Sequence, residues 1–286
     1  MKTYLDCIPC FMAQTLRAGQ VATDDEHKIK ELLDEVGSKI REIPMTCTPP
    51  ETGEFIYRLV REVTGVEDPY SEIKEKSIRE VRSLLPRMRD MVKSSEDRLL
   101  AAIRLATIGN VLDFGIQRRY DLMEEIGKME HMHYAIFHYD SFRERLAQTD
   151  SVLFIGDNAG ESVFDRLLAE ELGRPVTYVV REVPVINDVT REDAIASGLH
   201  EVATIVSSGS TAPGTILRLC TGEFLEMYRD SGMVISKGQG NYEGLSESGR
   251  QVFFLLRAKC PIIARDIGVN VNDFVLLDSS LSGQHP

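Results

Sequence analysis

Apolar residues recur every three or four positions through most of the first half of the chain, on faces opposite the charged residues. This spacing is typical of amphipathic α-helices that bury one face. The segments that show the pattern are residues 25–43, 51–64, 71–93 and 96–108. We expect no strand before about residue 150, so residues 1–148 are predicted to form an α-helical bundle domain.

Three histidines, His131, His133 and His138, lie close together near the end of this half. A histidine cluster can hold a metal ion, but here no carboxylate is obviously placed to complete a site. We therefore favour a structural interpretation, an aromatic-rich helix that connects the two halves of the chain.

After residue 150 the pattern changes to short, continuous apolar runs separated by helical segments. Runs of this kind are typical of strands that are buried on both faces. The expected strands are residues 151–155, 176–180, 202–206, 233–236, 252–256 and 274–277. Their alternation with helices predicts an α/β fold with a doubly wound, mainly parallel sheet over residues 149–286.

The charge balance narrows the classes of partner. The 286 residues include 33 Lys and Arg against 45 Asp and Glu, which gives a net charge of −12. Nucleic acids and acidic membrane surfaces would repel such a chain, so neither is expected as a partner. A small phosphorylated metabolite is still compatible with this charge, because one bound metal ion reverses the sign of a site locally.

Sequence features that mark secreted and membrane proteins are missing from this chain. The N-terminal segment lacks the apolar run of a signal peptide. No stretch reaches the roughly 18 continuous apolar residues of a transmembrane helix. Five cysteines, an odd number, are more typical of thiols or metal ligands than of a disulfide framework. We expect a cytoplasmic protein.

Polar or glycine-rich loops follow each of the first four expected strands of the second half. In chain order these loops carry Asp157 and Asn158, then Asp188, then Ser208 and Gly209, and finally Lys237. In a doubly wound sheet the ligand binds beyond the carboxyl ends of the strands, near the point where the strand order reverses. We therefore expect these four loops to meet at one site.

The chemistry of this predicted site follows from what stands after its first strand. A dinucleotide-binding fold would carry Gly-x-Gly-x-x-Gly there. Asp157 and Asn158 occupy that place instead, and with Asp188 they supply hard oxygen ligands of the kind that magnesium and manganese prefer. Lys237 could neutralise the charge that a phosphoryl group develops in the transition state. The glycine-rich turn after the third strand could donate amides to phosphate oxygens.

Simpler interpretations exist for each of these residues. An Asp or Asn after a strand commonly forms a turn or caps a helix, and a lone Lys is commonly a solvated surface charge. Asn110 and Asp113, three apart on an apolar helix, would face the same way, but the spacing alone favours a polar helix end. Cys7 and Cys10 could bind metal, with Cys47 and a histidine completing a zinc site, could be redox-active, or could pack.

Taken together, the motifs resemble the damage-control phosphatase family, formerly called domain of unknown function eighty-nine. The matching segments are Cys7-Ile8-Pro9-Cys10, Thr48-Pro49-Pro50, Ile108-Gly109-Asn110-Val111-Leu112-Asp113, Gly156-Asp157-Asn158-Ala159-Gly160-Glu161, Asn187-Asp188 and Ser236-Lys237-Gly238-Gln239-Gly240-Asn241-Tyr242-Glu243. They span nearly the whole chain, in the family's order. The cysteine pair and the Gly240-Asn241-Tyr242-Glu243 segment are similar to the smaller, largely prokaryotic subfamily.

The resemblance implies an α-helical domain beside a Rossmann-like domain, and hydrolysis of damaged or side-product sugar phosphates or nucleotides. It also implies a divalent metal, namely manganese, nickel, cobalt or magnesium, held by Asp157, Asn158 and Asp188. Asn110 and Lys237 would lie at the substrate phosphate, with Asp113 supporting Asn110. We expect direct attack of a metal-activated water on phosphorus; a covalent role for Asp157 is the alternative.

Two other functions suit a sheet of this type. An S-adenosylmethionine-dependent carboxyl methyltransferase would bind its nucleoside in the same crevice, although no Gly-x-Gly follows the first strand here. A non-catalytic metal- or nucleotide-binding protein would hold the same ligands without turnover. Neither explains the combination of oxygen ligands, a lysine and amide-rich loops as simply as phosphate ester hydrolysis does.

Overall fold

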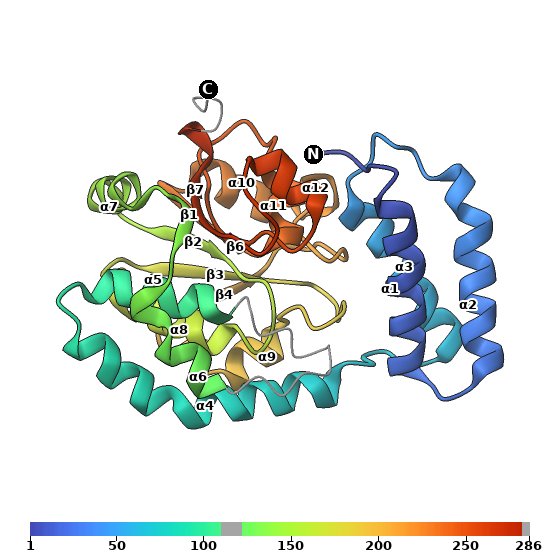
Figure 1. The fold of residues 1–286 in the computed structure, drawn as a ribbon, viewed down its shortest axis with the longest axis horizontal. Helices are drawn as coiled ribbons and strands as arrows, with labels where there is room; N and C mark the ends of the chain where they lie inside the picture. Colours follow the sequence, from blue (N-terminus) through green and yellow to red (C-terminus); the bar gives the residue numbers. More distant parts are fainter. Residues whose placement is uncertain (110–121, 282–286) are drawn as a thin grey trace.

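The structure of the chain, a computed structural model, describes residues 1–109 and 122–281. One seven-stranded sheet in the order β1-β7-β6-β5-β2-β3-β4 forms its centre (Figure 1). The strands are β1 Tyr134–Phe137, β2 Val152–Ile155, β3 Val176–Val180, β4 Thr204–Ser207, β5 Met233–Lys237, β6 Phe253–Arg257 and β7 Phe274–Asp278. All neighbouring strands pair in parallel except β6 and β7, which are antiparallel. This confirms the predicted α/β fold with a mainly parallel sheet.

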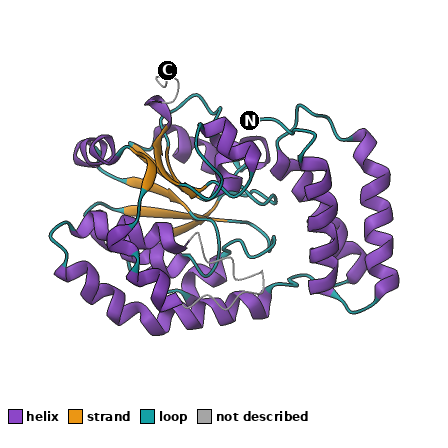
Figure 2. Ribbon diagram, viewed as in Figure 1, coloured by secondary structure: helices purple, strands orange, loops and turns teal. Residues whose placement is uncertain are grey.

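Helices cover both faces of the sheet (Figures 1 and 2). The α-helices in the described residues are α1 Cys7–Ala22, α2 Glu26–Lys39, α3 Pro49–Thr64, α4 Ser71–Ser94, α5 Arg98–Gly109, α6 Leu122–Gly127, α7 Tyr139–Gln148, α8 Ser162–Glu171, α9 Arg191–Ala196, α10 Gly222–Asp230, α11 Gln239–Leu245 and α12 Pro261–Ile267. The helices α4, α5 and α8 pack on one face and α10, α11 and α12 on the other. Successive strand residues such as Phe154 and Ile155 point to opposite faces, so each enters a different core. This two-sided burial explains why the strands read as continuous apolar runs.

One strand departs from the prediction. The expectation that no strand precedes residue 150, and that a helix covers residues 131–138, is wrong, because β1 occupies Tyr134–Phe137 and pairs with β7. Its burial alternates, as expected for a strand at the edge of a sheet. Four residues give only two repeats of that alternation, too few to separate a strand from a helix by pattern.

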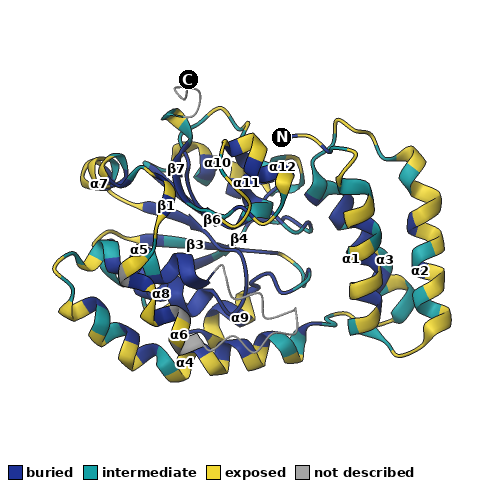
Figure 3. Ribbon diagram, in the orientation of Figure 1, coloured by how far each residue is buried: buried dark blue, intermediate teal, exposed yellow. Residues whose placement is uncertain are grey.

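The helices α1, α2 and α3 pack on one another and form a separate layer beside the sheet, here named the α1–α3 unit (Figure 1). At the start of α3, Thr48 and Glu51 cap the helix reciprocally and Pro49 takes the first helical position. The outer side of α2 is largely exposed (Figure 3). By contrast α4 and α5 pack on α8. The division into domains at residues 148 and 149 stays a prediction.

No helix in the described part of the chain is both long and apolar enough to cross a membrane.

Candidate functional site

The site lies where the strand order of the sheet reverses. From β2 the chain continues to β3 and β4 on one side, whereas β5 and β6 lie on the other side of β2. Parallel pairing sets Ile155 of β2 beside Ser236 of β5, so the loops that follow both strands leave the sheet at the same edge. Asp157 and Lys237 therefore come close together, at the position where doubly wound sheets bind ligands.

The loop after β3 folds back onto the loop after β2. Asn158 and Asp188 form an isolated antiparallel bridge. The amide of Val189 donates to the Asp157 carbonyl at 2.8 Å, and the amide of Ala159 donates to the Asn187 carbonyl at 2.8 Å. These backbone bonds bring Asp188 to the consecutive residues Asp157 and Asn158, from which it is distant in the sequence.

Negative charge is concentrated and buried at this point. Asp157 is 8% exposed, Asp188 is 5% exposed and Glu161 is fully buried. Burial, Glu161 and Asp188 raise the pKa of Asp157 well above its usual range. Burial also raises the pKa of Asp188, although the neighbouring Arg181 opposes this effect. Carboxylates that destabilise one another in this way are stabilised by a bound cation.

The donor set fits a hard divalent cation. The Asn158 Nδ2 donates to Asp157 Oδ2 at 3.1 Å and to Glu161 Oε1 at 2.5 Å, which leaves its side-chain oxygen as an acceptor beside the two aspartates. Two carboxylates and one amide oxygen suit magnesium or manganese, with water completing the shell. Among the described residues, no three His, Cys, Asp or Glu side chains gather as a metal site, so Cys7, Cys10 and Cys47 form no zinc cluster there.

A glycine permits the close approach of β5 to Asp157. Gly238 follows Lys237 with φ +77°, a conformation that side chains rarely adopt. A Cβ atom at this position would lie 1.9 Å from Asp157 Oδ2. Any side chain at Gly238 would therefore displace a predicted metal ligand.

Asp188 is held by a buried network centred on Asn241. The Asn241 Nδ2 donates to the Gly156 carbonyl at 2.9 Å and to the Lys237 carbonyl at 2.8 Å. Its Oδ1 accepts from Arg181 Nη2 at 2.8 Å, and Arg181 Nε donates to Asp188 Oδ2 at 2.7 Å. The network thus joins the ends of β2 and β5 to a predicted metal ligand.

Lys237 has its charge balanced inside the protein. Its Nζ lies 3.0 Å from Glu161 Oε2 and 2.7 Å from Asp165 Oδ1, and all three side chains are fully buried. Burial alone would lower the pKa of Lys237, but the two carboxylates raise it above its usual value. Burial raises the pKa of Asp165 to about 6, against the effect of Lys237. A contact between Lys237 and a phosphate stays a prediction.

The structure does not bring the predicted phosphate-binding turn to the cavity. Ser208 donates its amide to Val180, and the Gly209 amide donates to Ser207 Oγ. Neither Ser208 nor Gly209 lines the cavity described below. A further predicted pair, Asn110 and Asp113, lies outside the described residues.

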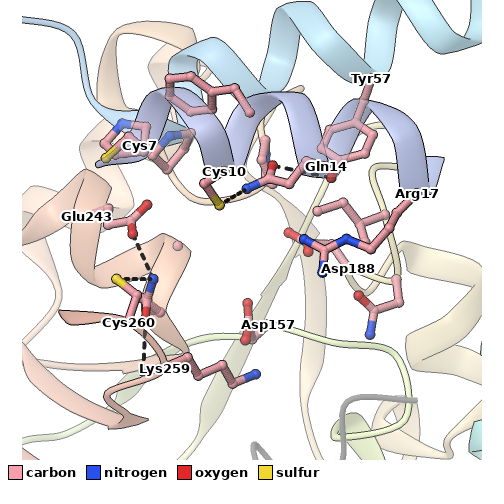
Figure 4. A pocket seen from close by; sticks show the side chains of 18 of the residues that line it. Cys7, Cys10, Gln14, Arg17, Tyr57, Asp157, Asp188, Glu243, Lys259 and Cys260 are labelled. Atoms are coloured by element: carbon pink, nitrogen blue, oxygen red, sulfur yellow. Dashed lines mark hydrogen bonds between the residues drawn. The ribbon is translucent and has the colours of Figure 1, made fainter. Parts of the chain in front are cut away.

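A cavity of about 720 Å³ opens between the sheet edge and the α1–α3 unit (Figure 4). The sheet side contributes Asp157, Asn158 and Asp188, and α1 contributes Gln14 and Arg17. This volume lies within the range of small-molecule sites and exceeds what one metal ion or phosphate fills. Helical and sheet segments therefore share one binding space.

The predicted Cys-x-x-Cys motif lies at one end of this cavity. Cys7 and Cys10 begin α1, and Cys260 faces them from the loop that precedes α12 (Figure 4). Burial raises the pKa of the Cys7 thiol, and Glu243 and Cys260 add to this effect. The Cys10 Sγ accepts from Gln14 Nε2 at 3.2 Å. Cys260 packs against the apolar core on one side and lines the cavity on the other.

Glu243, the last residue of the Gly240-Asn241-Tyr242-Glu243 motif, lines the cavity as a buried carboxyl group. Its Oε1 accepts from Gln239 Nε2 at 3.0 Å. Burial raises its pKa from 4.5 to about 7. The folded protein therefore holds this proton more tightly than the unfolded chain, so the stabilisation is complete below pH 4.5 and is lost as the pH rises to about 7.

We expect Glu243→Gln to remove this pH dependence. Relative to wild type, the free energy of unfolding of the variant should rise by about 3 kcal/mol between about pH 4.5 and about pH 7, the value that corresponds to the pKa shift. Urea denaturation of the metal-free proteins across this range measures the difference. Glu31→Gln, at an exposed position on α2, is the control. A constant difference between Glu243→Gln and wild type would contradict this assignment.

Sequence reasoning missed three residues of this site. Arg181 directly follows β3, so the rule that located Asp157 could also have found it. Arg17 on α1 and Lys259 after β6 line the cavity, but neither belongs to a pattern that marks a site. Only the folded chain brings them to the carboxylates.

Comparisons with known proteins identify the family of this chain. Residues 3–275 match the family described as the damage-control phosphatase ARMT1-like domain. A damage-control phosphatase of Archaeoglobus fulgidus is 33% identical over 94% of this chain and 96% of its own length. One of Pyrococcus horikoshii is 33% identical over 94% of this chain and 95% of its own length. A solved structure of a DUF89 family protein from Pyrococcus horikoshii matches with a TM-score of 0.90 at 31% identity, covering 98% of this chain and 99% of that chain. The chain therefore belongs to the damage-control phosphatase ARMT1-like family.

Proposed function

We propose that this protein is a divalent-metal-dependent phosphatase that hydrolyses phosphoric monoesters of small metabolites. The observation that carries the proposal is the convergence of Asp157, Asn158 and Asp188 on the wall of a cavity large enough for a metabolite. Two relatives that cover nearly the whole chain carry the name damage-control phosphatase. Damaged or side-product sugar phosphates and nucleotides are the substrate class that we infer.

Asp157, Asn158 and Asp188 would hold the metal ion. When bound, a divalent ion there would supply Lewis acidity, which activates water and offsets charge on the phosphoryl group. The chain's own residues fix this geometry. Arg181 orients Asp188 through its 2.7 Å contact, and Glu161 orients the Asn158 amide. We retain direct attack of water on phosphorus as the proposed mechanism, because a carboxylate engaged with a cation is a poor nucleophile.

A screen of phosphate esters tests the proposal. The metal-stripped protein would be assayed against sugar phosphates, nucleotides and p-nitrophenyl phosphate, with magnesium, manganese, nickel and cobalt supplied in turn. We expect phosphate release that depends on added metal. Tight binding of an ester without turnover under any metal would instead favour the non-catalytic binding function, and binding of a labelled methyl donor would favour the methyltransferase.

A further inference from the structure

Two basic side chains line the cavity from different elements of the fold. These are Arg17, on α1, and Lys259, in the loop between β6 and α12. Within the described part of the chain, neither charged group forms an ion pair or a hydrogen bond, although Lys259 is near enough to Asp157 to oppose the rise in the pKa of that carboxyl group. The backbone amide of Lys259 donates to Gln239 Oε1. Unpaired cations that face a shared cavity are available to bind an anion from solution.

Among the described residues, two further buried cations near the predicted metal ligands already have carboxylate partners. Lys237 pairs with Glu161 and Asp165, and Arg181 pairs with Asp188. Counted over the described residues alone, Asp157, Asp188, Glu161 and Asp165 outnumber these two cations by two charges. One divalent metal ion balances that excess and leaves no positive charge over for the substrate.

A phosphate monoester brings a charge of about −1.5 to −2 near neutral pH. Among the cavity-lining side chains of the described residues, Arg17 and Lys259 supply the two positive charges that match it. They come from opposite walls. Figure 4 shows Arg17 extending from α1 toward Asp188, and Lys259 extending from the opposite wall toward Asp157. An anion held at the metal ligands would thus be flanked on both sides.

We propose that Arg17 and Lys259 bind the phosphoryl oxygens of the substrate from opposite walls of the cavity. The inference rests on the proposed phosphatase function and extends it, because half of the phosphate site then belongs to the α1–α3 unit. A guanidinium group can donate two parallel hydrogen bonds to phosphate oxygens, whereas an ammonium group acts as a point charge. Arg17 therefore sets the orientation of the phosphoryl group, and Lys259 mainly its charge balance.

Binding of inorganic phosphate tests the proposal without turnover. Calorimetric titration with magnesium present, and again without metal, would compare wild type with Arg17→Gln and Lys259→Gln. We expect each variant to bind phosphate about 10- to 100-fold more weakly under both conditions, as for the loss of a hydrogen bond to a charged group. Arg17→Lys should recover part of the affinity lost in Arg17→Gln, because it restores the charge without the paired donors.

Arg58→Gln is the matched control. Arg58 lies on α3 in the same α1–α3 unit, pairs with Glu54 and Glu62, and does not line the cavity. The Arg58→Gln variant should bind both phosphate and metal as wild type does. In steady-state assays Arg17→Gln should raise KM and also lower kcat, because Arg17 both binds and orients the phosphoryl group, whereas Arg58→Gln should change neither.

Phosphate affinity within about twofold of wild type in both Gln variants would overturn this proposal, and so would a wild-type protein that binds no phosphate. Failure of the phosphatase function is a separate result. A wild-type protein that binds phosphate through Arg17 and Lys259, yet hydrolyses no ester with any metal, would refute the enzymatic function and leave the anion site standing.

Discussion

Asp188→Asn is expected to lower the rate of metal-stimulated phosphate release by more than about 100-fold. Even substitution of a residue that only hydrogen-bonds to a metal ligand commonly lowers metal affinity or activity 10- to 100-fold. The substitution keeps an oxygen that can accept from Arg181, whose Nε lies 2.7 Å from the present carboxylate. It removes one of the two carboxylate charges of the proposed cation site. The fold should therefore survive while metal affinity and turnover are lost.

Initial rates at saturating manganese, with far-ultraviolet circular dichroism of the same samples, check this prediction. Asp90→Asn is the matched control, because Asp90 is exposed on α4 and far along the chain from the site loops. Turnover of Asp188→Asn within about tenfold of wild type, in a folded protein, would remove Asp188 from the metal site.

Lys237→Met is expected to lower the free energy of unfolding by about 3 to 5 kcal/mol near neutral pH, because it leaves two buried carboxylates without a cation partner. Glu161, Asp165 and Lys237 are all fully buried, so water cannot replace the lost partner. The methionine keeps the length of the side chain, which separates loss of charge from loss of packing. Guanidinium denaturation of metal-free protein measures the effect.

The loss in Lys237→Met should shrink as the pH falls. Burial already raises the pKa of Asp165 to about 6 with Lys237 present, and removal of the lysine raises it further. At low pH the carboxyl group takes up a proton in the folded state and the uncompensated charge disappears. Adding Asp165→Asn to Lys237→Met should recover part of the stability at neutral pH. A destabilisation below about 1 kcal/mol would show that the buried pairs contribute little.

The sheet could be predicted from the sequence because burial on both faces leaves an unambiguous pattern. Strands such as Val176–Val180 are continuous apolar runs, and polar loops follow them at the edge where a doubly wound sheet binds ligands. That rule found Asp157, Asn158 and Asp188 from their places in the chain. The short edge strand Tyr134–Phe137 was not predicted, because its alternation of buried and exposed residues covers only four residues.

The rest of the site depends on contacts that no local pattern encodes. Arg17 is one arginine on an amphipathic helix. It can be recognised as a residue of the site only in the folded chain, where α1 packs across the cavity from Asp188. The same holds for Lys237. Its place directly after the expected strand 233–236 was predicted, but its two carboxylate partners were not. The family assignment from the motifs is confirmed. Membership of the smaller subfamily with an N-terminal Cys-x-x-Cys pair stays a prediction.

The most direct test is a manganese titration of metal-stripped protein, followed by phosphate release from p-nitrophenyl phosphate. We predict negligible release without metal and a saturable rise with added manganese, which Asp157→Asn and Asp188→Asn abolish. Equal rates of phosphate release in excess chelator and in saturating manganese would contradict a metal-dependent site at these carboxylates.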